Sequence, residues 1–515
     1  MESPVAGTSV QNDTGTDGVA YDRILSLLFV AAAGAFALLA LAMVYTGWRA
    51  GLGLTPTSGT WTALAADLKH GTFYRPMYGE LGYGGTRYLP LHFVLQAALM
   101  MLGLGPEAAG HTLEAFAGLA LLFGIYRVQR ELRIDPRLAA CVSVLALAPK
   151  AAQIAILSIR GDLLPTALNV LGLAICMSPK VDRRRVLSAA LLFILAFAAK
   201  PTSLYGAGAV ALSFLLCKQF RNAAYLAIAT GLGCAAVVGV VALASGGRFI
   251  AVFRACAVTA GFSLPVGLWH FAIIPTMVLP VELVFLILGF AAFLALMRNR
   301  ASSMPAMFFV SAAVATAIVL GAIGANINHF LDIDIASLIA FSAWLSGSHA
   351  KERAFGVAAL LFTAVFASFP ISYGMLHPDT GGYFDFGYER AFQQTLGFLG
   401  KQDKPILAAN PLLPILAGQR PYVLDLWMFR MVSEKNRPFA KAMSDGIEQH
   451  KFAAIVLEDE LGSQTDPYAF PGSMTEEIRQ NYQLAKQFPR AYIFLPREPQ
   501  QGANAPAEIK SAGAH

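Results

Sequence analysis

The side chains that could do chemistry lie in short polar segments between long apolar runs. Only 14% of the residues are charged, yet carboxylates and basic groups occur together in these segments. An ionisable side chain costs about 2.5–3.5 kcal/mol at the centre of a bilayer and less near its surface, so each one is a candidate for a functional role. The residues singled out are Asp67, Glu80, Arg87, Arg160, Asp162, Lys200, Arg248, Arg254, His329, Asp332 and Asp334.

Together these residue types suit transfer of a group from a phosphate-linked lipid. A carboxylate can take the proton from an acceptor hydroxyl, while lysine and arginine bind and neutralise the departing phosphate. We therefore predict three catalytic residues, which are Asp67, Asp162 and Glu80. For binding the donor phosphate or substrate we predict Arg87, Arg160, Lys200, Arg248 and His329.

Several of these residues also have a structural interpretation. Asp162 could pair with Arg160 or cap the helix that begins at Leu163. Lys200 could extend along apolar surface to the lipid headgroups. Asp67 lies in an amphipathic helical pattern, where its carboxylate could simply face water.

No motif of a soluble enzyme is present. The sequence GYGG at residues 82–85 lacks the GxGxxG pattern, and there is no HExxH, CxxC or Walker sequence. The five cysteines are isolated and have no metal-ligand spacing. We therefore predict no metal-ligand residues and no certain cofactor, although carboxylates beside a phosphate leave open a divalent cation, Mg²⁺ or Mn²⁺.

The elements that position these residues are membrane helices. Of the 515 residues 56% are hydrophobic, and runs such as Ile24–Val44 and Ala223–Ala244 match the length of a bilayer-spanning helix. The net charge of +6 comes from short basic clusters between apolar runs. Membrane topology explains such clusters better than nucleic-acid binding, which we exclude.

Placing every dense basic cluster on the cytoplasmic side predicts about eleven spans. Residues 1–22 form a cytoplasmic segment, and residues 23–372 form the transmembrane domain, whose first external loop covers 48–110. In that loop Pro90–Leu104 is apolar but only about fifteen residues long, and counting it as a full span would place Arg127, Arg130, Arg133 and Arg137 outside the cell. The excess of Lys and Arg in cytoplasmic loops favours the alternative, so we interpret it as a juxtamembrane helix.

The composition changes after about residue 373. Charges become frequent, and short apolar runs such as Ala453–Leu457 and Ala491–Leu495 are typical of buried strands. Residues 373–500 are therefore predicted to form a small external α/β domain. The remaining residues, 501–515, are predicted to be a disordered tail.

Four segments resemble the GT-C membrane glycosyltransferases, most closely the family 39-like bacterial group. That group has protein O-mannosyltransferases, aminoarabinose transferases and rhizobial galacturonosyltransferases as relatives. The segments cover roughly residues 20–345, in the family's order. They are Trp61–Tyr74 with Arg87-Tyr88-Leu89-Pro90-Leu91, Ile159-Arg160-Gly161-Asp162-Leu163-Leu164, Ala198-Ala199-Lys200-Pro201-Thr202 and Asn328-His329-Phe330-Leu331.

The resemblance implies transfer of a sugar from a polyprenyl-phosphate donor to a lipid, glycan or protein acceptor of the envelope. It places the reaction at the outer face of the bacterial cytoplasmic membrane, with membrane lipid around the protein. Asp162 matches the family's second acidic position. Ser58-Gly59-Thr60-Trp61 stands where the family has its first one. Either Asp67 or Glu80 substitutes, or the chain is a non-catalytic scaffold or a transporter of lipid-linked saccharide.

Overall fold

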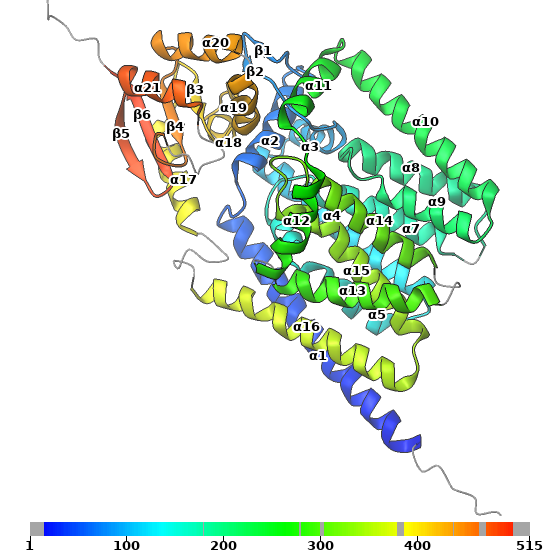
Figure 1. The fold of residues 1–515 in the computed structure, drawn as a ribbon. Coiled ribbons are helices and arrows are strands. Elements are labelled where there is room, and N and C mark those ends of the chain that lie inside the picture. Colours follow the sequence, from blue (N-terminus) through cyan, green and yellow to red (C-terminus); the bar gives the residue numbers. More distant parts are fainter. Residues whose placement is uncertain are drawn as a thin grey trace, which may run out of the picture.

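The structure is a computed structural model, and it describes residues 15–178, 180–277, 280–298, 303–377, 386–435, 437–462 and 470–497. A body of packed helices carries a smaller region of strands and helices at one end (Figure 1). We call residues 386–497 the C-terminal region and residues 48–110 the first loop.

Long apolar helices build the body, as the hydrophobic runs predict. Within the described residues six helices are long and apolar enough to cross a membrane. A seventh span results if residues 136–157 count as one span bent by 77°. The six are α1 (Gly15–Arg49, apolar from Arg23), α4 (Pro106–Glu131), α10 (Phe220–Ala244), α13 (Pro280–Arg298), η3 with α15 (Ile327–Phe330 and Leu331–Gly347) and α16 (Ala350–Leu376).

The prediction of a multi-pass membrane protein is confirmed. Reaching eleven spans would require helices shorter than eighteen residues to cross as well, so that number stays a prediction. The other helices of the body are α5 (Pro136–Val144), η1 (Leu145–Leu147), α6 (Lys150–Leu157), α7 (Leu163–Cys176), α8 (Arg183–Ala199), α9 (Tyr205–Leu216), α11 (Arg248–Ala260), α12 (Leu264–Met277) and α14 (Ser303–Val319).

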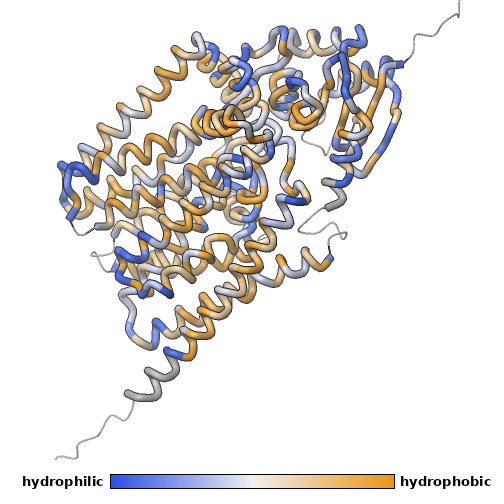
Figure 2. The backbone as a smooth tube through the Cα atoms, turned by 180° about the vertical axis from the view of Figure 1, so that it is seen from behind, coloured by the Kyte–Doolittle hydropathy of each residue, from blue (hydrophilic) through white to orange (hydrophobic). Residues whose placement is uncertain are grey.

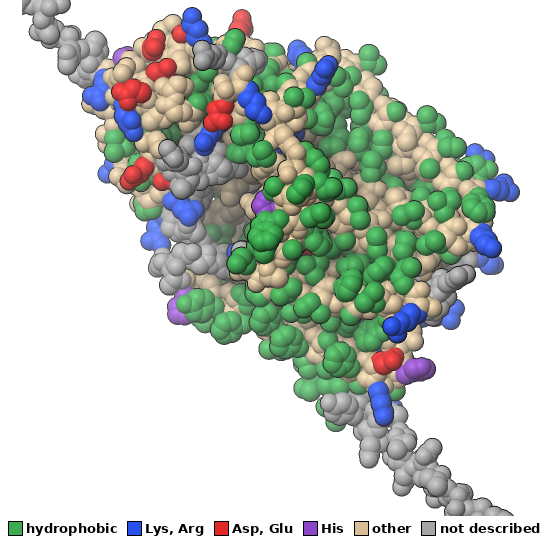
Figure 3. All heavy atoms as spheres, viewed as in Figure 1, with side chains coloured by type: hydrophobic (Ala, Val, Ile, Leu, Met, Phe, Trp, Pro, Cys, Tyr) green, Lys and Arg blue, Asp and Glu red, His purple; other side chains and the backbone are tan. Residues whose placement is uncertain are grey.

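The surface of the body is apolar, as lipid contact requires. Helices α1 and α16 pack along each other, and both turn large apolar side chains outward. Leu38 is 71% exposed and Phe369 is 73% exposed. Figure 2 shows hydrophobic residues throughout the body, and Figure 3 shows acidic side chains gathered on the C-terminal region.

The first loop folds into two helices and a small hairpin. Helix α2 (Pro56–Lys69) starts with Pro56 in its first turn, where a missing N–H is harmless. Strands β1 (Tyr78–Gly79) and β2 (Gly82–Tyr83) pair antiparallel. Helix α3 (Leu91–Met101) has eleven residues. It is about 16 Å long, which is too short to cross a bilayer of about 30 Å.

The C-terminal region contains a four-stranded sheet in the order β3-β4-β6-β5. Strands β3 and β4 are parallel, and the other two pairs are antiparallel. Alternate side chains of β4 face opposite layers: Val456 packs with α17, and Ile455 with α20 and α21. The elements are α17 (Phe386–Leu399), β3 (Ile406–Ala408), α18 (Leu412–Leu416), α19 (Leu426–Lys435), α20 (Arg437–Glu448), β4 (Ala454–Leu457), α21 (Gly472–Asn481), β5 (Tyr482–Phe488) and β6 (Ala491–Pro496).

The C-terminal region docks on the first loop through backbone pairing. The N–H of Tyr83 donates to the carbonyl of Tyr422 at 2.8 Å, and the N–H of Leu424 donates to the carbonyl of Tyr83 at 3.1 Å. The side-chain amide of Asn410 donates to the carbonyl of Leu54 at 2.7 Å. These contacts fix the edge of the C-terminal region above the membrane helices.

Candidate active site

A cavity of about 630 Å³ lies where the first loop, the helical body and the C-terminal region meet. Its volume is within the range of about 300–1,000 Å³ that is usual for ligand sites. The residues that line it come from α2, the end of the first loop, the turn before α7, the segment after α8, α11, the chain from the end of α14 through η3, and the C-terminal region. The charged ones and His329 are Arg87, Arg160, Asp162, Lys200, His329, Asp425 and Glu458.

Asp162 is the centre of a buried charge cluster in the cavity wall. Its Oδ1 lies 2.8 Å from Nζ of Lys200, and its Oδ2 accepts a hydrogen bond from the amide of Asn328 at 3.1 Å. Arg160 Nε lies 3.5 Å from Oδ2. Burial opposes ionisation, but the charges of Lys200 and Arg160 outweigh it and hold the pKa of Asp162 below its usual value. Asp162 therefore remains ionised and keeps two cations side by side.

The turn that carries Arg160 and Asp162 is fixed by hydrogen bonds from its backbone to Glu114 of α4. One oxygen of Glu114 accepts the N–H groups of Arg160 at 3.1 Å and Gly161 at 3.0 Å. The same oxygen lies 2.9 Å from Nε2 of His92 in α3. Both side chains are fully buried. Sequence reasoning missed Glu114, although a carboxylate inside an apolar run is a signal that could have found it.

Gly161 is required at its position for two reasons. Its φ is +65°, a conformation that other residues rarely adopt. A Cβ atom there would also lie 3.1 Å from the rings of both His92 and Trp61. The Arg-Gly-Asp turn therefore fits closely against the first loop.

Ser58 connects the first loop to the same turn. Its Oγ donates to the carbonyl of Gly53 at 2.6 Å and accepts the N–H of Ile159 at 3.1 Å. The residue is fully buried. The position where the resemblance implies an acid is thus occupied by a residue that joins two backbone segments.

Three basic side chains face the cavity from separate segments. Lys200 and Arg160 belong to the Asp162 cluster, and Arg87 comes from the end of the first loop. The guanidinium of Arg87 lies 4.8 Å from the centre of the Trp427 ring, in cation–π contact. His329 completes this side of the wall. Five of the predicted site residues, including Asp162, are therefore brought together.

Six of the eleven residues singled out in the sequence do not line the cavity, Asp332 and Asp334 among them. Asp67 is buried between Arg75, at 2.6 Å, and Arg420 of the C-terminal region, at 2.7 Å. Glu80 is exposed in the turn between β1 and β2. Arg248 and Arg254 are exposed on α11. In the structure Asp67 holds the first loop to the C-terminal region and Glu80 faces solvent, so neither carboxylate is in the cavity wall, and their role as bases stays a prediction.

Asp332 and Asp334 lie beneath the site, in the first turn of α15. One oxygen of Asp332 accepts hydrogen bonds from Thr166 at 2.6 Å and from Tyr205 at 2.8 Å. Asp334 is fully buried, and neither of its oxygens has a hydrogen bond within the described part of the chain. Neither aspartate lines the cavity.

The described residues do not provide a metal site made of side chains. Nowhere in them do three or more His, Cys, Asp or Glu side chains lie close enough together to hold an ion. In the cavity wall, the oxygens of Asp162 are already bound by Lys200 and Asn328.

Comparison with solved structures shows a shared fold. The chain is similar to ArnT from Cupriavidus metallidurans bound to undecaprenyl phosphate, with a TM-score of 0.56 and 13% identity, over 89% of this chain and 97% of that one. For the apo state of ArnT the TM-score is 0.56 and the identity 12%, over 90% of this chain and 98% of that one. For AglB from Archaeoglobus fulgidus, in complex with an inhibitory peptide and a dolichol-phosphate, the TM-score is 0.47 and the identity 12%, over 81% of this chain and 69% of that one.

No family model matches the sequence, and no curated protein does. The resemblance to GT-C proteins that four short segments carry is nevertheless confirmed at the level of the fold. The α-helical membrane architecture with a small C-terminal α/β region is confirmed as well.

Proposed function

We propose that this protein transfers a glycosyl group from a polyprenyl-phosphate-linked sugar to an acceptor in the bacterial cell envelope. The observation that carries the proposal is the convergence of Arg87, Arg160 and Lys200 on one cavity beside Asp162. A phosphate ester is the ligand that such a group of cations recognises. ArnT, which shares the fold, was solved with undecaprenyl phosphate bound.

In this reaction the cations act on the leaving group. The bond between the anomeric carbon and the phosphate oxygen breaks, and negative charge grows on the phosphate. Lys200 and Arg160 are already fixed by Asp162, so they stabilise that charge without reorganising. Asp162 thus serves as a positioning residue for the phosphate site, and its lowered pKa makes it a weak base.

The reaction would take place on the outer face of the cytoplasmic membrane. This orientation follows from the basic clusters, such as residues 183–185, which lie at the ends of the helices remote from the C-terminal region. Cysteines introduced at Arg130 and Arg184 should be protected from an impermeant reagent added outside, and one at His450 should be labelled. The opposite pattern would place the site in the cytoplasm and favour nucleotide-sugar donors.

A non-catalytic scaffold or a transporter of lipid-linked saccharide is the second candidate. It is favoured by one observation, that the residues of the first loop lining the cavity include no carboxylate. The two functions differ in turnover, because a scaffold or transporter would bind a lipid-linked sugar without cleaving it.

The test uses the full chain in lipid nanodiscs. Binding of undecaprenyl phosphate is measured first, in wild type and in Lys200→Gln. A charge-assisted hydrogen bond contributes about 1.5–3 kcal/mol, so this variant should bind roughly 10- to 150-fold more weakly. Lys404→Gln, at a lysine outside the cavity, is the matched control.

Turnover is then followed with a panel of radiolabelled undecaprenyl-phosphate sugars and envelope extracts. Release of undecaprenyl phosphate together with a labelled acceptor supports the proposal. Binding without release in every combination would favour the scaffold or transporter. Equal binding by Lys200→Gln and wild type would refute the assignment of the phosphate site.

A further inference from the structure

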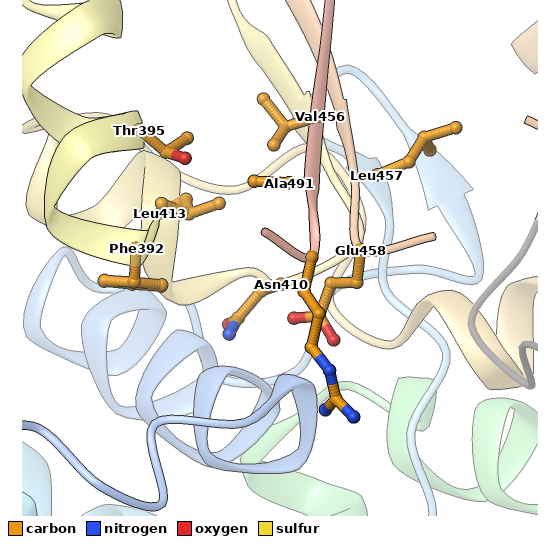
Figure 4. A pocket seen from close by; sticks show the side chains of 9 residues that line it. Phe392, Thr395, Asn410, Leu413, Val456, Leu457, Glu458 and Ala491 are labelled. Carbon is orange, nitrogen blue, oxygen red and sulfur yellow. The ribbon is translucent and has the colours of Figure 1, made fainter. Parts of the chain in front are cut away.

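The C-terminal region forms one wall of the cavity, and that wall is acidic. Asp425, Trp427 and Glu458 all line it. Glu458 directly follows β4, and Asn410 lies just beyond the end of β3. Since β3 and β4 are parallel, their carboxyl ends meet at one edge of the sheet, the edge where α/β sheets usually bind ligands. Figure 4 shows Asn410 and Glu458 at this edge.

Asp425 reaches the cavity because of the pairing between the first loop and the C-terminal region. The backbone of residues 422–424 is bonded to Tyr83, which directs the chain towards the site. One oxygen of Asp425 then accepts the N–H of Met428 at 2.9 Å, in the first turn of α19. The residue is 7% exposed, and its carboxylate interacts with the positive charge of Arg87.

Trp427 lines the cavity beside these groups. Its ring lies on the guanidinium of Arg87 and also contacts Gly324 in the segment before η3. A Cβ atom on Gly324 would be only 2.5 Å from the ring, so the indole fits closely against this backbone. The first loop, the helical body and the C-terminal region therefore meet at one indole.

The C-terminal region also occupies the space beside Gly59 of the first loop. A Cβ atom on Gly59 would lie 2.5 Å from Oδ1 of Asn410 and 2.8 Å from the N atom of Leu412. No side chain larger than hydrogen fits at this position while the region is docked. The residues of the first loop that line the cavity include no carboxylate, so the carboxylates of the cavity wall come from other elements.

Three carboxylates line the cavity, and their environments differ. Asp162 is held ionised by Lys200 and Arg160, as described above. For Asp425, burial is the main influence and raises the pKa, against the opposing effects of the Met428 N–H and Arg87. A general base works best when its pKa is close to the working pH, which favours a carboxyl group of raised pKa.

We propose that the C-terminal region supplies the residue that takes the proton from the acceptor, and that this residue is Asp425. The inference rests on the proposed glycosyl transfer. The acceptor hydroxyl oxygen forms a bond to the anomeric carbon as the bond from that carbon to the phosphate oxygen breaks. The bonding electron pair stays on the phosphate, and the hydroxyl proton passes to the Asp425 carboxylate. The products are the glycosylated acceptor and polyprenyl phosphate.

The decisive variant is Asp425→Asn. Asparagine caps a helix as well as aspartate does, so α19 and the docking of the C-terminal region are preserved. Loss of a general base costs about 10²–10⁴-fold in the transfer rate. We expect this loss with unchanged binding of undecaprenyl phosphate. Asp403→Asn, at an exposed carboxylate of the same region outside the cavity, should transfer at the wild-type rate.

The pH profile provides a second measurement. Because the base acts in its ionised form, wild-type transfer should fall as the pH drops through the raised pKa of Asp425. That acid limb should lie above about 3.9, the ordinary aspartate value, and should be missing from the residual rate of Asp425→Asn. A residue that only caps a helix would leave both the rate and the limb unchanged in this variant.

Each outcome decides the matter. Wild-type transfer by Asp425→Asn overturns the inference but leaves the proposed function standing. A loss in Glu458→Gln combined with normal transfer by Asp425→Asn also overturns the assignment of Asp425. A wild-type protein that binds undecaprenyl phosphate and transfers no sugar refutes the proposed function, and the inference falls with it. A parallel loss of undecaprenyl phosphate binding in Asp425→Asn would make the residue part of the donor site and would likewise overturn the inference.

Discussion

Replacing Asp67 by asparagine should loosen the attachment of the C-terminal region without removing a catalytic group. Asp67 is 3% exposed in its side chain, Arg75 is fully buried, and Arg420 is 27% exposed. Both arginines donate to the carboxylate through two nitrogens each. Asparagine offers one acceptor oxygen and places an NH₂ group against the remaining guanidinium donors.

The size of the effect follows from these contacts. Breaking a buried ion pair by removing one partner costs about 3–5 kcal/mol. Arg75 keeps its hydrogen bonds to the carbonyls of Leu81 at 2.6 Å and Pro421 at 2.7 Å, so the lower end applies. A cost of about 3 kcal/mol corresponds to a roughly 150-fold larger population of the undocked state.

Hydrogen exchange reports this opening directly. The amides of Tyr83 and Leu424 bond across the interface, and their exchange in Asp67→Asn should be roughly 150-fold faster than in wild type. Glu80→Gln, at the exposed carboxylate of the same loop, is the matched control and should not change exchange. Unchanged exchange in Asp67→Asn, together with a 10²–10⁴-fold loss of transfer, would show that Asp67 is the base and would refute our reasoning.

Three further predictions concern the turn before α7 and the docking interface. Replacing Glu114 by leucine should weaken undecaprenyl phosphate binding at least 10-fold, because it leaves two buried N–H groups without an acceptor, at about 1–3 kcal/mol each; Glu114→Gln should retain most of it. The stability that Asp162 contributes should be present above the ordinary pKa of about 3.9 and be lost only as the pH falls through its lowered pKa. The difference in the free energy of unfolding between wild type and Asp162→Asn should therefore stay constant from about pH 8 to about pH 5. A decline of this difference in that interval would contradict the assigned pKa shift. Gly59→Ala should accelerate amide exchange at Leu424, whereas Gly105→Ala, where a Cβ atom meets nothing within 4 Å, should not.

Local patterns were enough to predict the membrane helices and half of the site. Long apolar runs predict spanning helices because a bilayer leaves few alternatives. Four polar segments stood out because charges are costly between such runs, and the structure brings Arg87, Arg160, Asp162, Lys200 and His329 into one cavity. These residues signal their position through their immediate neighbours in the sequence.

The acidic wall of the cavity could not be predicted in that way. Arg420, the partner of Asp67, lies 353 residues further along the chain, so an amphipathic pattern cannot distinguish a solvent-facing carboxylate from a buried ion pair. Asp425 and Trp427 lie in an ordinary charged segment, where neither residue is costly. Their place in the site depends on the backbone pairing of Tyr83 with residues 422–424, for which no periodicity in the sequence is a signal.

Docking of the C-terminal region and completion of the site are the same structural event. Arg87 contributes its charge to the cavity only while its guanidinium is held against Trp427, and Trp427 is in place only while the pairing with Tyr83 holds. Undocking would leave Lys200 and Arg160 on Asp162, because those contacts lie wholly within the helical body. It would remove the acidic wall and release Arg87 at the same time. The phosphate site formed by Lys200, Arg160 and Asp162 can therefore persist when Asp425 has left the cavity. Donor binding should accordingly be less sensitive than sugar transfer to any substitution at the docking interface.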